Sequence, residues 1–198
     1  MAIKLASIFF TMILVDNYVL AKFLGICPFL GVSKKLDSAV GMSLAVTFVM
    51  VMATAATWPL YMGILAPNGL ENLQTIVFIL VIAILVQLLE NFLKKFIPAL
   101  YKSLGVYLPL ITTNCTILGV TILNLDNGYS FPESIVCAAG AGIGFLVAMV
   151  LFSGVRRKVE QAIVPECFKG LPITLVAAAM TSLSFMGFGG IVEAIFGV

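Results

Sequence analysis

Six long apolar segments fill most of this 198-residue chain. About 20 consecutive apolar residues in a helix cross a bilayer, and each segment is long enough to do so. Hydrophobic residues make up 62% of the chain and charged residues only 10%, too few to cover a soluble domain. We therefore predict an all-α polytopic membrane protein, one domain over residues 1–198, with spans near residues 5–33, 38–62, 72–93, 97–123, 133–155 and 171–193.

Several kinds of site are excluded by composition. The chain has no histidine, which rules out histidine-ligated haem, histidine-bound zinc and a Ser-His-Asp triad. No basic cluster is interleaved with aromatic residues, so nucleic acid is not an expected partner. The first residues run directly into an apolar segment without a small-residue cleavage site. We expect this segment to be a retained span and not a removed signal peptide.

Glycine and proline interrupt two of the six segments. Gly25 and Pro28 fall inside the first, and Gly105 and Pro109 fall inside the fourth. A helix break at membrane depth is tolerated only where protein or a cavity surrounds it. Interrupted segments at corresponding positions in two halves of a membrane protein indicate a binding site. We therefore expect the functional site at these two breaks.

A short repeat supports a division into two halves. Residues 27–32 and residues 115–120 both read Cys-x-x-Leu-Gly-Val. Each copy lies in the first span of a three-span half, about residues 1–95 and about residues 96–198. An odd number of spans places the second half upside down relative to the first. We therefore predict two inverted three-helix repeats whose first helices, the first and fourth of the chain, are broken.

Basic residues are confined to alternate connections. The connections after the second and fourth spans carry acids, such as Glu71, Asp126 and Glu133, and no lysine or arginine. Because basic loops stay inside, both termini are expected outside. Lys4 alone opposes this orientation. The basic residues in or beside the connections after the first, third and fifth spans are Lys34, Lys35, Lys94, Lys95, Lys102, Arg156, Arg157, Lys158 and Lys169.

Each break also places a cysteine near a predicted helix start. Pro28 suits the first position of a half-helix that follows Cys27. Thr113 and Asn114, like Thr112 before them, are good N-cap types ahead of Cys115. A helix N-terminus favours thiolate, the form that binds metal. Two thiolates cannot complete an iron–sulfur centre that takes four cysteines; a disulfide between them, or a packing role for both, remains open.

The other two cysteines and a glycine run have simpler interpretations. Cys137 is expected to be a small buried apolar residue, and Cys167 an incidental residue of a loop. Gly140, Gly142 and Gly144 lie in mid-span with no strand before them. This run is expected to permit close helix packing and not to bind a nucleotide.

Charged residues within or beside the spans are candidates for an ion path. Asp16, Lys22 and Glu90 lie inside or at the edge of apolar segments, and such residues usually face a cavity or a partner. Asp16 and Glu90 could therefore line a cation path. For Glu90, an ion pair with Lys94 one helical turn later is the simpler alternative.

Three sequence blocks are distinctive: Val15 to Lys35, Leu108 to Cys115, and Ser184 to Phe188. They resemble those of the A subunits of Rnf complexes, and the similarity covers essentially the whole chain. The same superfamily includes the E subunit of Rnf complexes, together with the D and E subunits of the sodium-pumping NADH:quinone reductase. The Gly-Ile-Cys-Pro-Phe and Thr-Thr-Asn-Cys motifs are more similar to the Rnf A pattern than to that of the quinone reductase E subunit.

The resemblance implies a redox function in a prokaryotic cell (inner) membrane. Rnf complexes transfer electrons between ferredoxin and NAD⁺ while moving Na⁺ or H⁺. Among the Rnf subunits, the A subunit pairs with an inverted homologue, the E subunit. Each of the two supplies two cysteines to a shared [2Fe–2S] cluster. Cys27 and Cys115 match those positions.

Other functions remain open from the sequence. The chain could be the E subunit of a sodium-pumping quinone reductase, a non-redox transporter or channel with inverted repeats, or a structural membrane scaffold. The cysteines discriminate between the classes. Transport would survive serine at both positions, whereas cluster binding would fail.

Overall fold

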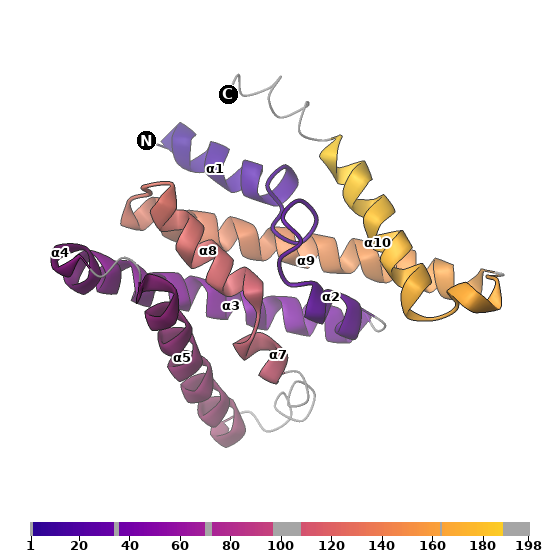
Figure 1. The fold of residues 1–198 in the computed structure, drawn as a ribbon, viewed down its shortest axis with the longest axis horizontal. Helices are drawn as coiled ribbons and strands as arrows, with labels where there is room; N and C mark the ends of the chain where they lie inside the picture. The colour runs from indigo at the N-terminus through magenta and orange to yellow at the C-terminus, as the bar shows by residue number, and fades with distance from the viewer. Residues whose placement is uncertain (1, 34–35, 70–72, 97–107, 163, 188–198) are drawn as a thin grey trace.

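The computed structural model describes residues 2–33, 36–69, 73–96, 108–162 and 164–187 (Figure 1). Every regular element in these ranges is a helix, which confirms the all-α prediction. In chain order they are α1 (Ala2–Leu14), α2 (Ile26–Val32), α3 (Leu36–Leu60), the π-helical η1 (Tyr61–Leu65), α4 (Ala66–Asn68), α5 (Gln74–Phe96), α7 (Leu108–Thr112), α8 (Cys115–Asp126), α9 (Phe131–Gln161), the 3₁₀-helix η3 (Glu166–Phe168) and α10 (Leu171–Met186).

Each of the six predicted spans contains helix. Within the described residues, three stretches are long and apolar enough to cross a membrane: Leu36–Asn68, Gln74–Asn91 and Phe131–Gln161. Shorter apolar helices occupy the first, fourth and sixth segments, at Lys4–Leu14, Leu110–Asp126 and Leu171–Met186. The short helices of the first and fourth segments result from the predicted breaks.

The first break is longer than predicted and begins earlier. Helix α1 ends at Leu14, and α2 begins only at Ile26, after Gly25 adopts the left-handed conformation with φ of 82°. Pro28 is therefore the third residue of α2 and not the first, which corrects its predicted position. The first turn still accommodates it, because N–H groups there have no intrahelical acceptor. The second break falls at residues 113–114. Pro109 lies inside α7, and Gly105 lies outside the described residues.

A buried asparagine holds the first break in place. Asn17 is 1% exposed. Its Nδ2 donates to the carbonyl oxygen of Gly144 in α9 at 2.8 Å. Its Oδ1 accepts from the backbone N–H groups of Val19 at 3.1 Å and Leu20 at 3.4 Å. Non-helical backbone within a membrane needs such internal partners, so this one side chain both satisfies the break and fixes it to α9.

Replacing Asn17 by alanine is expected to destabilise the protein by about 2–4 kcal/mol, because three buried polar groups lose their partner. The measurement is the free energy of unfolding in mixed micelles on titration with SDS. Asn68→Ala is the matched control, since Asn68 is exposed and its Nδ2 donates to the carbonyl oxygen of Ile64, four residues earlier. Equal stability of the two variants would contradict this role for Asn17.

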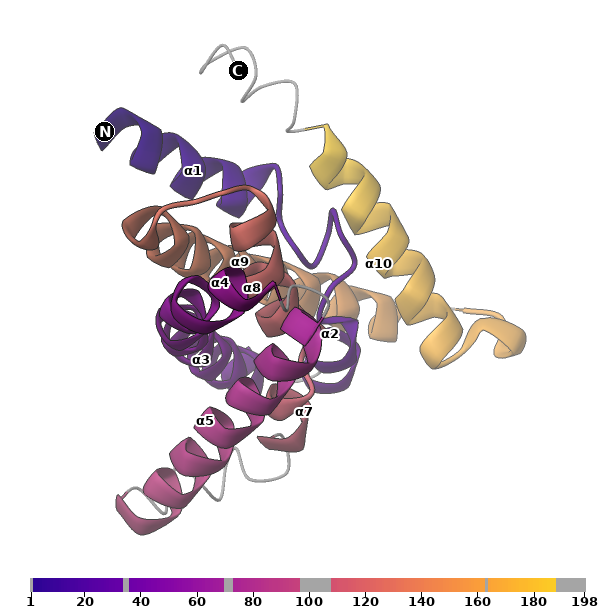
Figure 2. The same ribbon diagram turned by 60° about the vertical axis from the view of Figure 1, so that its left-hand side comes forward.

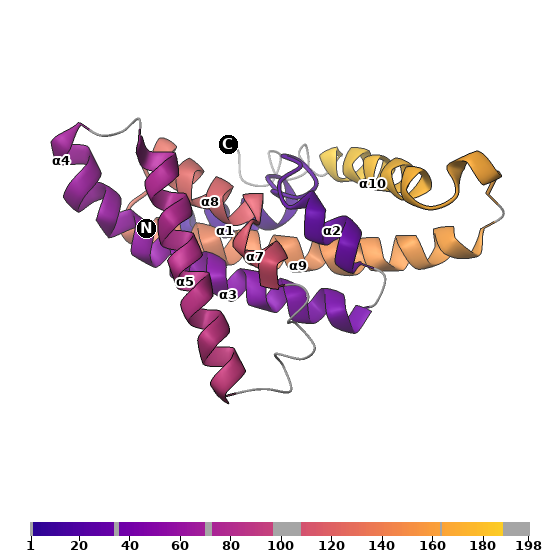
Figure 3. The same cartoon turned by 60° about the horizontal axis from the view of Figure 1, so that its bottom comes forward.

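Helices α3 and α9 form the core, with their lengths packed side by side (Figures 1 and 3). Helix α1 packs on α9, and α8 packs on α3. As predicted, the glycine run in α9 permits close packing, here of α1 and α3 against α9. A Cβ on Gly140 would lie 3.1 Å from the Phe9 carbonyl oxygen, and one on Gly144 would lie 2.9 Å from that of Met12. A Cβ on Gly142 would collide with Thr47 of α3. Helices α5 and α10 lie on opposite sides of the core (Figure 2).

Several connections lie at the two ends of the α3–α9 core. The start of α1, helix α4 and the α8–α9 connection lie at the left of Figure 1, whereas the ends of α2 and α9 lie at the right. At the left end, Lys4 forms an ion pair of 2.8 Å with Glu133. Lys4 therefore adds no net charge to that end. This explains how one lysine can coexist with the charge asymmetry of the other connections.

Candidate metal site at the two helix breaks

The two helix breaks contact each other. A Cβ on Gly25, at the first break, would collide with Oγ1 of Thr116 and lie 3.1 Å from Oδ1 of Asn114. A Cβ on Gly119 would lie 2.6 Å from Cδ1 of Leu24. Only glycine allows these approaches. Chain segments almost ninety residues apart in sequence thus meet where each carries a cysteine.

Cys115 is the first residue of α8, and its environment is that of a capped helix start. Asn114 is the N-cap, with extended backbone and an Oδ1 that accepts from the Thr116 N–H at 3.1 Å. This confirms Asn114 as a cap among the predicted candidates. Thr113 precedes the cap, and its carbonyl oxygen lies 4.0 Å from the Cys115 Sγ. Asn114 is buried, but the thiol beside it is exposed.

Cys27 is the second residue of α2 and lies in its first turn, whereas the sequence pattern predicted a position just before the helix. Both Cys27 and Cys115 are free and exposed, so the structure contains no disulfide between them. Exposure also argues against a packing role. Cys137 provides the contrast, because it is fully buried, as predicted for a small apolar residue. Cys167 is exposed in η3, consistent with its loop assignment.

The two thiols fit half of a cluster site. They come from segments that touch, they lie in the first turns of α2 and α8, and they are exposed. Helix starts present free N–H groups that favour anionic ligands. Within the described ranges, no group of three or more histidine, cysteine or acidic side chains could hold a metal ion. A centre with four thiolate ligands would therefore need two more from another chain.

The two acidic candidates lie in separate places. Asp16 lies at the first break, with Lys22 Nζ 3.9 Å from its Oδ1. The same ammonium group lies 5.1 Å from the ring centroid of Tyr18. Glu90 is half-buried near the C-terminal end of α5, one helical turn before Lys94. The structure therefore does not bring Asp16 and Glu90 into one site, and a role for either in an ion path stays a prediction.

Two residues that anchor the cysteine-bearing helices were missed in the sequence. Arg156 of α9 donates through Nη1 to the Leu30 carbonyl oxygen and, at 2.8 Å, to Oγ of Ser33, both at the end of α2. Trp58 of α3 donates through Nε1 to the Tyr129 carbonyl oxygen, after α8, at 3.1 Å. In the sequence, Arg156 is visible only as a charge that sets the topology. No local pattern relates residues 123 positions apart.

The sequence matches the family described as "Rnf-Nqr subunit, membrane protein" over residues 5–192. It is 54% identical over 180 residues to the A subunit of the ion-translocating oxidoreductase complex of Syntrophotalea carbinolica, which covers 91% of this chain and 93% of the relative. It is 53% identical over 186 residues to the A subunit of the Na⁺-translocating ferredoxin:NAD⁺ oxidoreductase complex of Acetobacterium woodii, covering 94% and 97%. The corresponding A subunit of Aliivibrio salmonicida is 51% identical over 181 residues, covering 91% and 94%. The chain therefore belongs to the Rnf-Nqr family of membrane proteins, among the A subunits of ion-translocating oxidoreductase complexes.

Proposed function

We propose that this chain transfers electrons within an ion-translocating ferredoxin:NAD⁺ oxidoreductase complex, through a [2Fe–2S] cluster shared with a homologous inverted subunit. The observation that carries the proposal is the pair of free, exposed thiols, Cys27 and Cys115, on two helix starts that touch. Each of the two chains would supply two of the four cysteine ligands. The complex would couple electron flow to the movement of Na⁺ or H⁺.

The thickness of the bilayer gives a reason for a redox centre within the membrane. Its hydrocarbon core is about 30 Å thick, too wide for an electron to cross readily without an intermediate stop. A bound [2Fe–2S] cluster takes up and releases one electron. The chain's own part is to hold two thiolates and to offset their charge with the N-termini of α2 and α8. Both helices are anchored at their far ends by Arg156 and Trp58.

The helix contacts support inverted repeats over residues 1–95 and 96–198. The broken first span of each half packs against the second helix of the other half: α1, which precedes the first break, packs on α9, and α8, which follows the second break, packs on α3. Within each half, the second helix contacts the third, α3 with α5 and α9 with α10. Hydrogen bonds also run between the halves in both directions. Arg156 of the second half donates to Leu30 of the first, and Trp58 of the first half donates to Tyr129 of the second. Two inverted repeats would pack against each other through such contacts between the halves.

The test is reconstitution of the complete complex into proteoliposomes. We expect ferredoxin-dependent reduction of NAD⁺ to drive uptake of Na⁺, or of H⁺ if uptake is independent of Na⁺. The rival function is non-redox transport by an inverted-repeat carrier. It predicts ion movement along a gradient without any electron donor, and that result would replace the proposal.

Glu90→Gln tests the proposed ion path. Glu90 is a half-buried carboxylate in α5. If it binds the moving cation, we expect ion uptake per electron to fall about tenfold, since charged groups in spans mark ion pathways. Cluster content should be unchanged. Asp16→Asn is a parallel variant at the break, and Asp126→Asn, exposed at the end of α8, is the control. Normal uptake by the Glu90 variant would remove that residue from the path and favour the simpler pairing with Lys94.

The membrane orientation is tested by labelling single cysteines with an impermeant maleimide in intact cells. Asn68 and Lys158 are both exposed and lie at opposite ends of the α3–α9 core. With both termini outside, Asn68→Cys is expected to react from outside, and Lys158→Cys only after the membrane is opened. The background variant carries Cys27→Ser, Cys115→Ser and Cys167→Ser, which removes the three exposed thiols. Labelling of both sites from the same side would exclude the six-span plan.

A further inference from the structure

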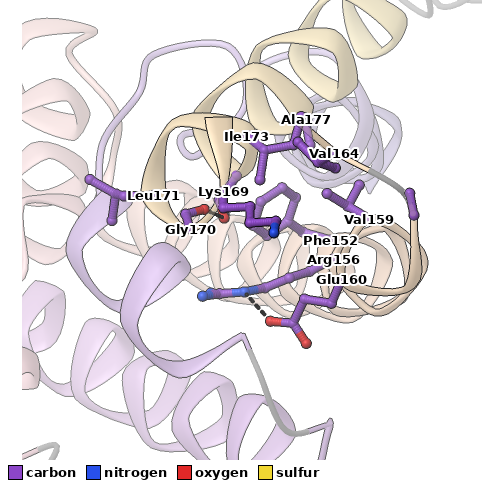
Figure 4. Close-up of a pocket in the computed structure, with 12 residues that line it drawn as sticks. Phe152, Arg156, Val159, Glu160, Val164, Lys169, Gly170, Leu171, Ile173 and Ala177 are labelled. Atoms are coloured by element: carbon purple, nitrogen blue, oxygen red, sulfur yellow. Dashed lines mark hydrogen bonds and ion pairs between the residues drawn. The ribbon is translucent and has the colours of Figure 1, made fainter. Parts of the chain in front are cut away.

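A cavity of about 380 Å³ lies between the last turns of α9 and the start of α10 (Figure 4). Helix α9 contributes Phe152, Arg156 and Glu160 to its walls. Helix α10 contributes apolar residues such as Ile173, and Lys169 extends into the cavity from the turn before α10. One part of the cavity is therefore charged, and the rest is apolar. The cavity is separate from the two helix breaks.

One buried nitrogen in the charged part of the cavity, Nε of Arg156, makes no hydrogen bond. The side chain of Arg156 is 10% exposed, and its Nη1 already donates to Leu30 and Ser33. Its Nε is buried and forms an ion pair of 3.4 Å with Glu160 Oε1 but no hydrogen bond. Lys169 lies 3.6 Å from Glu166, but the two side chains are 63% and 95% exposed. Such an exposed pair contributes little and exchanges readily. The two cations that line the cavity outnumber its single carboxylate, Glu160.

The position of the cavity suits a lipid headgroup. Helix α9 has 31 residues, about 46 Å of helix, which exceeds a hydrocarbon core of about 30 Å. Its last turns carry Arg156, Arg157 and Lys158, so this is the end expected at the level of the headgroups. Leu171 of α10 lines the cavity and is 63% exposed, and Leu175, one turn further along α10, is 46% exposed. They lie four residues apart and so share one face of the helix, an apolar track that leads from the charged part toward the membrane interior.

We propose that this cavity binds one anionic phospholipid. Its phosphate would lie between the guanidinium of Arg156 and the ammonium of Lys169. One acyl chain would follow Leu171 and Leu175 along α10. Basic pockets between membrane helices on the cytoplasmic side are suited to anionic headgroups. In this cavity the charged part would hold the headgroup, and the apolar part beside it would hold an acyl chain.

The experiment uses the complete complex in phosphatidylcholine liposomes that contain spin-labelled phosphatidylglycerol. The immobilised fraction of the spin label gives the relative association of the lipid. One basic residue near the surface contributes about 1 kcal/mol to binding of an anionic lipid, so Lys169→Gln is expected to weaken association about fivefold. Lys158→Gln is the matched control, because Lys158 is equally basic, exposed and outside the cavity. Equal losses would show diffuse surface attraction and overturn the proposal.

A second variant tests whether lipid binding depends on the space in the cavity as well as on its charge. Ile173→Trp fills the apolar part of the cavity without changing any charge, and it is expected to lower the immobilised fraction as much as Lys169→Gln does. Unchanged elution and helical content would establish that the variant folds. Displacement of the labelled lipid by inorganic phosphate would identify a free-anion site. Loss of a neighbouring subunit from the Ile173 variant, with no bound lipid in the parent complex, would identify a protein interface. Either result would refute the lipid site.

Discussion

Replacing Cys115 by serine is expected to reduce the iron bound by the chain and its partner to background and to stop electron transfer through the complex. Serine keeps the size and the helix start but removes a thiolate, and a [2Fe–2S] centre normally has four such ligands. Cys27→Ser should behave identically, since both thiols are free and exposed on touching segments. Ion uptake should stop with electron transfer. The measurements are iron content and ferredoxin-dependent NAD⁺ reduction.

The chain offers its own control for this experiment. Cys167 is also free and exposed but lies in η3, outside both breaks, so Cys167→Ser should keep iron and activity. Full ion pumping by an iron-free Cys115→Ser complex would contradict the redox function. Loss of iron from all three variants would indicate a general effect of removing thiols, and the assignment of Cys27 and Cys115 would fail.

Gly25→Ala is expected to destabilise the protein by about 2–5 kcal/mol. Two costs add. The left-handed conformation at φ of 82° costs a side chain about 1–2 kcal/mol. Overpacking against Thr116 Oγ1, Asn114 and Phe145 costs about 1–3 kcal/mol more. Because the contact joins the two breaks, cluster binding should fall as well. The measurement is the free energy of unfolding in mixed micelles.

Three comparisons separate these costs. Gly128→Ala has a positive φ of 63° and open space around the added Cβ, so it reports the backbone cost alone. Gly31→Ala, in α2, has neither problem and should be neutral or slightly stabilising. Thr116→Ala should restore part of the stability of Gly25→Ala, because Thr116 Oγ1 is buried, has no hydrogen-bond partner and is the atom the new Cβ meets. Additive effects of the two substitutions would mean that the breaks do not touch.

The helical content and the location of both breaks could be predicted, because they depend on local chemistry. Apolar length decides which segments are spans. Proline, glycine and N-cap residues act on their own turn, which is why Asn114 was identified correctly as a cap. The start of α2 was misplaced by two residues. The positive φ of Gly25 begins the helix before Cys27, and a sequence shows which residue can adopt that conformation but not whether it does.

What the sequence could not provide is the contact between the halves. The collision partner of Gly25, the donor to the end of α2 and the acceptor of Asn17 lie far away along the chain, at Thr116, Arg156 and Gly144. Such contacts depend on how helices pack. Asp16 illustrates the same limit. The sequence identified a charged residue in a span, but its neighbour Lys22 became a partner only because the chain turns between them.

The most direct test of a shared cluster is to count iron in the chain co-purified with its inverted homologue, and to record the EPR spectrum after reduction. A cluster held by two cysteines from each chain predicts about two iron atoms per pair of chains, with the spectrum of a reduced [2Fe–2S] centre that is absent from either chain alone. A monodisperse preparation of this chain alone that carries a complete cluster would contradict the account, and so would an iron-free pair that still transfers electrons.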